Sequence, residues 1–348
     1  MFDALKNGLY ASLAHSGLDR ALRPLLGGLG VIMTFHRVVP ETPAARHGPS
    51  HSLAVTADEF RGIVAYLRKI GYEIVSLDEV RRRLLEGSGE DRFACLTFDD
   101  GYLDNYEIVY PICRELDVPI TIYITIDLIE GRMVLWWYGL EAVVTQASTV
   151  QCPANGEIKT FAADTPARKI SAYREADALI RLTDEADRRR KIEYLEQEYG
   201  VDFTAISQDQ AMSWEMIEEL AASGLVTIGA HTVTHRALRT LSDDEVRSEI
   251  AESRTILEKR LSQPIRHFAY PFGRASDASE REYAICRALD FDTATTTRPG
   301  VLKPHHRDSL HSLPRISAAT GHSVRALRAD LSGVPSAAKS AYLSIKGS

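Results

Sequence analysis

Two adjacent carboxylates follow an apolar run in the segment LTFDDGY, residues 96–102. The run at 93–98 is typical of a buried strand, and parallel α/β proteins place their catalytic groups at the carboxyl ends of strands. Gly101 allows the backbone to turn there, so we expect Asp99 and Asp100 to reach one cleft. Two such close like charges need a neighbouring cation, because otherwise one carboxyl would stay protonated.

A second polar segment, GAHTVTH at residues 229–235, also follows an apolar run. Its imidazoles, His231 and His235, are four residues apart and would face the same way on a helical turn, which suits a divalent metal. With one Asp they would form a His, His, carboxylate set with open positions, as in a catalytic metal site. The pair alone is weak evidence, but together with the Asp99–Asp100 segment it favours a metal site.

Two further features are less specific. The aromatic cluster Trp136, Trp137 and Tyr138 could stack on sugar rings or anchor an insertion. The glycines at 27–30 lack the GxGxxG spacing and precede a strand, so no dinucleotide site is expected.

Short β-rich runs alternate with helical patterns along the chain, which is typical of parallel strands joined by helices. Predicted strands are 31–35, 93–98, 120–126, 225–230, 265–270 and 291–297. A predicted helix at 57–70 begins with the capping pair Thr56 and Glu59. Another begins with Ser242 and Glu245 and ends before Pro264.

The alternation of strands and helices is interrupted at residues 131–212. This segment carries a charged run of both signs and predicts a helical insertion with a solvated face. The remaining organisation is an N-terminal helical segment at 1–30, a main domain at 31–330 and a C-terminal tail at 331–348.

Composition excludes several classes of protein. The 348 residues include 41 Lys+Arg and 48 Asp+Glu, a net charge of −7 that argues against nucleic-acid binding. The four cysteines form no CxxC pair, so neither a sulfur-rich zinc site nor a disulfide scaffold is expected. Neither a secretory signal nor a transmembrane segment is evident, which predicts a cytoplasmic protein. An apolar face formed by Phe2, Leu5, Leu9 and Leu13 allows peripheral membrane contact.

Three motifs occur in order: TFDDG at 97–101, HTVTH at 231–235 and FAYPFG at 268–273. They resemble those of polysaccharide deacetylases of the NodB-homology type (carbohydrate esterase family 4), whose second and third motifs read H(S/T)xxH and RxPYG. The resemblance spans roughly residues 31–320. It implies an α/β fold built as a distorted, incomplete (β/α) barrel.

The resemblance also implies roles for individual residues. Asp99 would be the general base, and Asp100, His231 and His235 would hold a divalent metal, zinc or else cobalt, nickel or manganese. The bound ion would acidify its water and polarise the acetyl carbonyl. The Phe272 backbone N–H would help to bind the oxyanion. Around the substrate we expect Tyr270, Pro271, Phe272 and Tyr102.

In two places the sequence departs from the family pattern. Ala269 stands where the third motif has Arg, the usual partner of the base; Arg315 is a plausible replacement, or else an ordinary surface arginine. The general acid is commonly a histidine in a late LxH motif, and His311 fits this poorly. His36 directly follows the first strand, as in the branch resembling poly-N-acetylglucosamine deacetylases, and we favour it as the acid over a histidine that merely ends a strand. His305, His306 and His311 are weaker candidates.

The sequence therefore predicts a metal-dependent hydrolase that removes N-acetyl groups from a sugar of a polysaccharide, oligosaccharide or glycan precursor. An O-acetyl esterase or another amide C–N hydrolase on the same fold is one alternative, and a noncatalytic carbohydrate-binding protein is another. The sequence indicates neither the sugar nor an oligomeric state.

Overall fold

The computed structural model describes residues 17–41, 47–87, 91–181, 183–318, 324–335 and 337. Its central element is a curled parallel sheet in the strand order β11-β10-β9-β6-β5-β1-β12, with β4 pairing β5. The strands are β1 (Gly30–Phe35), β4 (Tyr72–Ile74), β5 (Arg92–Phe98), β6 (Ile120–Ile124), β9 (Val226–Ala230), β10 (His267–Ala269), β11 (Thr293–Thr295) and β12 (Ile316–Ser317). The sheet forms a half-barrel, which confirms the predicted α/β, incomplete-barrel class.

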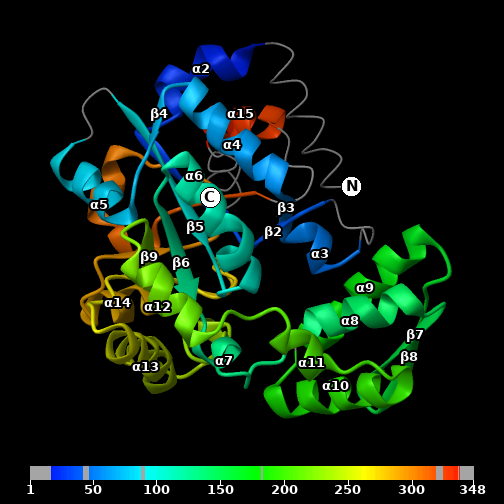
Figure 1. Ribbon diagram of the computed structural model, residues 1–348. Helices are drawn as coiled ribbons and strands as arrows, with labels where there is room; N and C mark the ends of the chain where they lie inside the picture. The colour runs from blue at the N-terminus through cyan, green and yellow to red at the C-terminus, as the bar shows by residue number, and fades with distance from the viewer. Residues whose placement is uncertain are drawn as a thin grey trace, which may run out of the picture.

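Helices cover the outside of this sheet (Figure 1). They are α2 (Leu18–Leu26), α4 (Ala57–Lys69), α5 (Leu77–Glu86), α6 (Tyr110–Leu116), α12 (Trp214–Ala222), α13 (Asp243–Leu261), α14 (Glu280–Ala288) and α15 (Val324–Leu331), whereas the short α7 (Ile126–Ile129) follows β6 at the carboxyl end of the sheet. Both predicted capping boxes are present, one at Thr56 and Glu59 and the other at Ser242 and Glu245. They satisfy backbone donors at the first turn and so fix where each helix begins.

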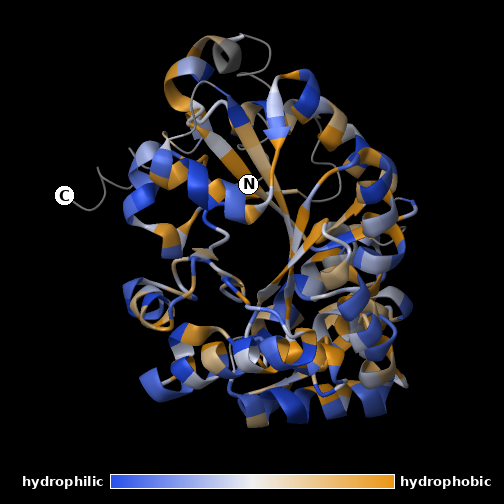
Figure 2. Cartoon of the chain, turned by 60° about the vertical axis from the view of Figure 1, so that its left-hand side comes forward, coloured by the Kyte–Doolittle hydropathy of each residue, from blue (hydrophilic) through white to orange (hydrophobic). Residues whose placement is uncertain are grey.

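The hydrophobic core lies between the sheet and the helices, and Figure 2 shows apolar strands surrounded by helices with polar outer faces. All six residues of β1 are buried, as expected for a parallel strand covered on both sides. Phe35 stacks on Phe98 of the neighbouring strand at 5.1 Å, and Phe60 of α4 meets both rings edge-on. This packing fixes β1 and β5 beside each other just before the polar residues that follow them.

The insertion forms a second body with its own hydrophobic core beside α7 (Figure 1). It contains α8 (Trp136–Gln146), β7 (Thr149–Ala154), β8 (Glu157–Ala162), α9 (Pro166–Arg181), α10 (Glu185–Tyr199) and α11 (Phe203–Gln208). The antiparallel β7–β8 hairpin was not predicted. It turns at Asn155 and Gly156, whose φ angles of 54° and 82° suit a tight two-residue loop.

Shorter elements complete the chain. They are β2 (Arg37–Val39), β3 (Ala54–Thr56), α3 (Pro49–Ser52) and the helical turns η1 (Asn105–Val109), η2 (Leu238–Thr240), η3 (Pro304–Asp308) and η4 (Leu310–Ser312). The apolar face predicted from Phe2 to Leu13 and most of the predicted tail lie outside the described residues. Among the helices that the structure describes, none has the length and apolar character to cross a bilayer.

Candidate metal and catalytic site

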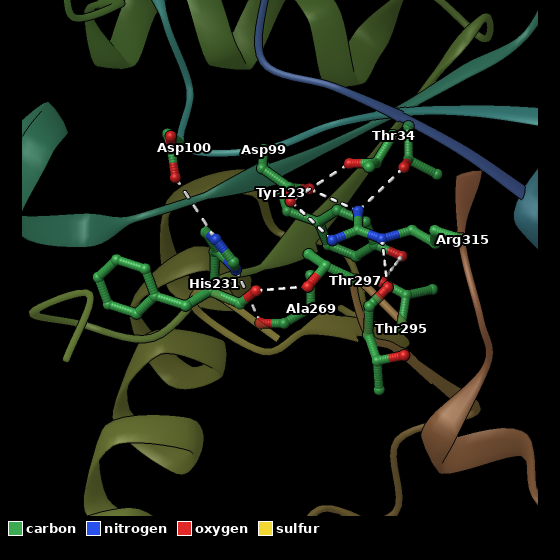
Figure 3. Close-up of polar contacts among 12 residues, drawn as sticks. Thr34, Asp99, Asp100, Tyr123, His231, Ala269, Thr295, Thr297 and Arg315 are labelled. Carbon is green, nitrogen blue, oxygen red and sulfur yellow. Dashed lines mark hydrogen bonds and ion pairs between the residues drawn. The ribbon is translucent and has the colours of Figure 1, made fainter. Parts of the chain in front are cut away.

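The predicted polar segments meet at the carboxyl ends of neighbouring strands. Asp99 and Asp100 follow β5, His231 follows β9 and His36 follows β1. The chain turns sharply after β5, because Asp100 and Gly101 have φ angles of 80° and 94°. This turn directs the two carboxylates to different partners (Figure 3).

Asp100, His231 and His235 form a compact group whose potential ligand atoms lie within 4.8 Å of one another. Asp100 Oδ1 is 3.4 Å from His231 Nε2 and 3.2 Å from His235 Nε2. Burial disfavours the charged carboxylate, but the two imidazoles outweigh burial and hold the pKa of Asp100 well below its usual value.

The donor atoms of this group fit a divalent metal. His231 Nδ1 donates to the Ala269 carbonyl at 2.7 Å, which leaves Nε2, the nitrogen directed at Asp100, as the atom that would bind a cation. Asp100 Oδ1 is buried without a hydrogen-bond partner in the described part of the chain. A buried carboxylate oxygen this close to two imidazole nitrogens gives one cation three possible donor atoms.

The prediction that His231 and His235 lie on a helical turn is wrong. The segment is a tight loop in which Thr232 and His235 have φ angles of 68° and 56°. Thr232 Oγ1 accepts the His235 N–H at 3.0 Å. Glu249 of α13 accepts the Val233 and Thr234 N–H groups at 2.9 and 3.0 Å, and these contacts hold the loop in place.

Asp99 is paired with Arg315, the contact expected from the sequence. The guanidinium donates from Nη1 and Nη2 to the two carboxylate oxygens, each at 2.7 Å. Arg315 is fully buried and also donates to Thr97 Oγ1 at 3.0 Å and to the Thr296 carbonyl at 2.9 Å. Burial raises the pKa of Asp99, but Arg315 outweighs burial, so the net pKa is lowered. Asp99 is therefore ionised and held in one orientation.

His36 follows Phe35, which pairs with Phe98 of β5, and the Asp99 N–H donates to the Phe35 carbonyl at 3.0 Å, so His36 and Asp99 leave neighbouring strands side by side. Burial lowers the pKa of His36, and Asp100 and Asp99 only partly offset that effect. The structure thus brings His36 to the group containing Asp99, Asp100, His231 and Arg315.

The third motif contributes its backbone to the same region. Phe272 has a φ of 58°, and its ring packs on the His235 ring at 4.9 Å. No described residue accepts a hydrogen bond from the Phe272 N–H, whereas its carbonyl accepts from Thr297 Oγ1 at 2.5 Å. Pro271, next to it, is buried.

The side chains of Tyr270 and Tyr102 are fully buried and pack against other aromatic rings. Tyr270 is fully buried against Phe268 and Tyr283, and its hydroxyl donates to the His311 carbonyl at 2.9 Å. Tyr102 is fully buried and packs edge-on against Tyr138 of α8 at 6.1 Å.

The other candidate histidines have different surroundings. The His311 ring makes a hydrogen bond to the Phe291 carbonyl at 2.7 Å. The His305 and His306 rings pack against each other at a tilt in η3, with centroids 4.3 Å apart, and His306 Nδ1 accepts the Lys303 N–H at 2.8 Å. None of the three is brought to the Asp99–Asp100 pair.

The sequence analysis missed several residues that shape the site. The Ala269 carbonyl orients His231, and a backbone oxygen carries no signal in residue type. Glu249 was missed for a different reason, because in the sequence it is one more charged residue on α13. For Trp137 the sequence analysis left open sugar stacking or anchoring of the insertion, but not its place: its ring lies 5.9 Å from that of His235, so the insertion forms part of the wall around the site.

Comparisons with known proteins agree with this geometry. Residues 188–288 match the family model described as Polysaccharide deacetylase. Over 275 residues, covering 78% of this chain and 68% of the relative, the chain is 20% identical to "Putative polysaccharide deacetylase YxkH" of Bacillus subtilis (strain 168).

Solved structures show the shared fold. The Streptococcus pyogenes deacetylase PplD in complex with acetate matches with a TM-score of 0.56 and 20% identity, over 84% of this chain and 93% of that one. IcaB from Ammonifex degensii matches with a TM-score of 0.55 and 18% identity, over 88% and 97%. The solved structures show that this chain shares their fold, and its residues 188–288 are similar to the polysaccharide deacetylase family model.

Proposed function

We propose that this protein is a metal-dependent hydrolase that removes N-acetyl groups from a sugar and yields a free amine and acetate. The observation that carries the proposal is the separation of two adjacent carboxylates. Asp100 faces His231 and His235, whereas Asp99 is paired with Arg315. One site thereby offers a metal-binding group and an ionised base that is not committed to that group.

Asp100, His231 and His235 would hold the metal, for which zinc is our first choice and cobalt, nickel and manganese are alternatives. A divalent ion in this set, when bound, polarises the acetyl carbonyl and lowers the pKa of a water molecule. Ala269 and Glu249 keep the two imidazoles in place through the contacts described above.

The remaining residues divide the proton transfers. Asp99 accepts the proton of the attacking water, because Arg315 keeps its carboxylate ionised and oriented. The Phe272 N–H, which has no acceptor among the described residues, is available to donate to the developing oxyanion. His36 gives a proton to the nitrogen of the leaving amine as the C–N bond breaks.

The substrate we propose is an N-acetylated sugar unit in a larger glycan. Trp137 lies next to His235 and is 9% exposed, so only a small part of its ring is open to pack on the C–H face of a sugar. The similarity of residues 188–288 to the polysaccharide deacetylase family model supports the carbohydrate class.

The test is acetate release from N-acetylglucosamine oligomers and O-acetylated sugars, with protein stripped by chelator and reloaded with single metals. We expect metal-restored release from an N-acetyl substrate. Release from O-acetyl sugars alone would replace the proposal by an esterase. Protein that binds no metal and releases no acetate would overturn it in favour of a carbohydrate-binding role.

Two variants test the division between the carboxylates. Asp99→Asn should abolish turnover and keep metal content near normal, because Asp99 does not face the two histidines. His235→Ala should lose both turnover and metal. Stoichiometric metal in His235→Ala would contradict the ligand assignment.

A further inference from the structure

The backbone that carries His36 is held by two consecutive side chains from the segment after the Asp99–Asp100 turn. Asn105 Nδ2 donates to the His36 carbonyl at 2.9 Å. Asp104 Oδ1 accepts the Val38 N–H at 3.0 Å, and Asp104 Oδ2 accepts from Arg37 Nε at 2.6 Å. Asp104 and Asn105 thus hold the junction at His36 and at both residues that follow it.

This network is buried and well connected. Asn105 is fully buried, and Asp104 is 5% exposed. Asn105 Nδ2 also donates to Asp104 Oδ1 at 3.1 Å, so the two side chains brace each other. A buried network of this kind resists displacement, because a broken contact would leave polar groups without partners.

The His36 ring has no comparable support of its own. Within the part of the chain that the structure describes, neither ring nitrogen makes a hydrogen bond. The position of the imidazole therefore depends on where the backbone places its Cα atom and on packing around the ring.

The network also extends to the insertion. The Arg37 guanidinium lies 5.4 Å from the ring centres of both Tyr102 and Tyr138, and Tyr138 belongs to α8. These cation–π contacts connect Asp104, through Arg37, with the helix that places Trp137 beside His235.

We propose that Asp104 and Asn105 are positioning residues for His36 in the deacetylation reaction, a role that rests on the proposed function. They act through the backbone of residues 36–38 and touch neither metal nor substrate. Their effect is confined to the step in which His36 donates a proton to the leaving nitrogen while the carbonyl C–N bond breaks. The proton then resides on the amine product, and the hydroxyl from water resides on the acetate.

The step can be isolated by the choice of leaving group. An amide nitrogen must be protonated before it can leave as an amine, whereas the phenolate of 4-nitrophenyl acetate leaves without a proton. A misplaced His36 should therefore slow the amide reaction far more than the ester reaction. A general loss of folding or of metal would slow both reactions by the same factor.

The variants are Asn105→Leu and Asp104→Asn. Asn105 Oδ1 has no hydrogen-bond partner among the described residues, so Leu, which is similar in size, removes an uncompensated acceptor together with the clamping donor. Thermal unfolding checks that each variant is folded, and Asp104→Asn, which preserves the side-chain shape, provides the second route. For each, kcat/KM on the N-acetyl substrate and on 4-nitrophenyl acetate is measured with metal-loaded protein.

We expect the ratio of amide to ester kcat/KM to fall about tenfold or more in both variants, with metal content unchanged. In a His36→Ala background, Asn105→Leu should lower that ratio no further. The matched control is Glu249→Gln, which disturbs the loop of His231 and His235. It should weaken metal binding and, at subsaturating metal, lower both activities in parallel.

The outcomes separate the two proposals. Wild-type protein that releases no acetate from any N-acetyl substrate would refute the proposed function itself. Active wild type with parallel losses on amide and ester in Asn105→Leu and Asp104→Asn would refute the positioning role alone. An additional loss of the ratio in the His36→Ala background would also refute it, because Asn105 would then act independently of His36.

Discussion

Removing the guanidinium of Arg315 should destabilise the protein by leaving Asp99 buried without its cation. Arg315 is fully buried and donates twice to Asp99, once to Thr97 and once to Thr296. Breaking one partner of a buried ion pair costs about 3–5 kcal/mol. We therefore expect Arg315→Met to lose about 4 kcal/mol at pH 7, a large fraction of the roughly 5–15 kcal/mol that stabilises a typical protein.

The loss should depend on pH with a definite sign. In the wild type the pKa of Asp99 is lowered, so its contribution to stability is present above about pH 4 and disappears only as the pH falls through the lowered pKa. In Arg315→Met, burial is no longer outweighed by the guanidinium, and the pKa of Asp99 rises above its usual value. The folded variant then takes up a proton that the unfolded chain lacks, and its stability decreases as the pH rises from about 4 to 7. The difference in unfolding free energy between the wild type and Arg315→Met should therefore increase from about pH 4 to pH 7.

The assay is urea unfolding at pH 5 and pH 7, followed by tryptophan fluorescence, with chelator present so that metal contributes nothing. Arg315→Lys keeps the charge without the planar fork and should lose less than Arg315→Met. The double variant Asp99→Asn with Arg315→Met removes both charges and should be more stable than Arg315→Met alone. The reasoning is refuted if Arg315→Met costs under about 1 kcal/mol, or if the double variant is no more stable.

Two predictions concern regions outside the site. Burial, followed by the charge of His305, lowers the pKa of His306 to about 4, so its stabilising contribution should be lost as the pH falls from about 6.5 to 4. Because the ring is partly exposed, we expect a reduced effect: His306→Gln should lose about 1–2 kcal/mol less unfolding free energy than the wild type as the pH falls from about 6.5 to 4. An unchanged dependence of stability on pH would show that His306 does not titrate in this range. In α8, a Cβ on Gly139 would come within 2.3 Å of the buried Phe203 ring, so Gly139→Ala should destabilise the protein by about 1–3 kcal/mol in urea unfolding. Gly62 in α4 has open space around it, and Gly62→Ala should instead stabilise by about 0.5–1 kcal/mol; the same sign in both variants would contradict the packing argument.

The strands and capped helices could be predicted because their signals are local. The hydrophobic run before Asp99 and the capping pair at Ser242 and Glu245 each involve neighbouring residues, and the structure confirms both. The Asp100, His231 and His235 group could be predicted because all three follow strands, and parallel strands present their carboxyl ends at one edge.

The loop conformations and backbone contacts of the site could not be predicted in this way, because they depend on tertiary contacts that residue types do not indicate. The loop at 231–235 was expected to be helical because its spacing suits a helix, but Glu249 and the left-handed Thr232 and His235 give it another shape. The Asn155–Gly156 turn did carry a hairpin signal, which the charge pattern of the surrounding insertion obscured. Backbone groups such as the Ala269 carbonyl leave no trace in composition.

Ala269 stands where the third motif of the similar family has arginine, and Arg315 shows how Asp99 can still be paired with a cation. Asp99 needs a cation in contact, but the sheet does not dictate which strand supplies it. Because β12 pairs with β1 and β1 pairs with β5, a long side chain just before β12 can reach the end of β5. Arg315 does so, and it also binds the Thr296 carbonyl just beyond β11, the strand at the other end of the sheet. One guanidinium therefore orients Asp99 and connects both edge strands of the half-barrel, so its loss should affect catalysis and stability together.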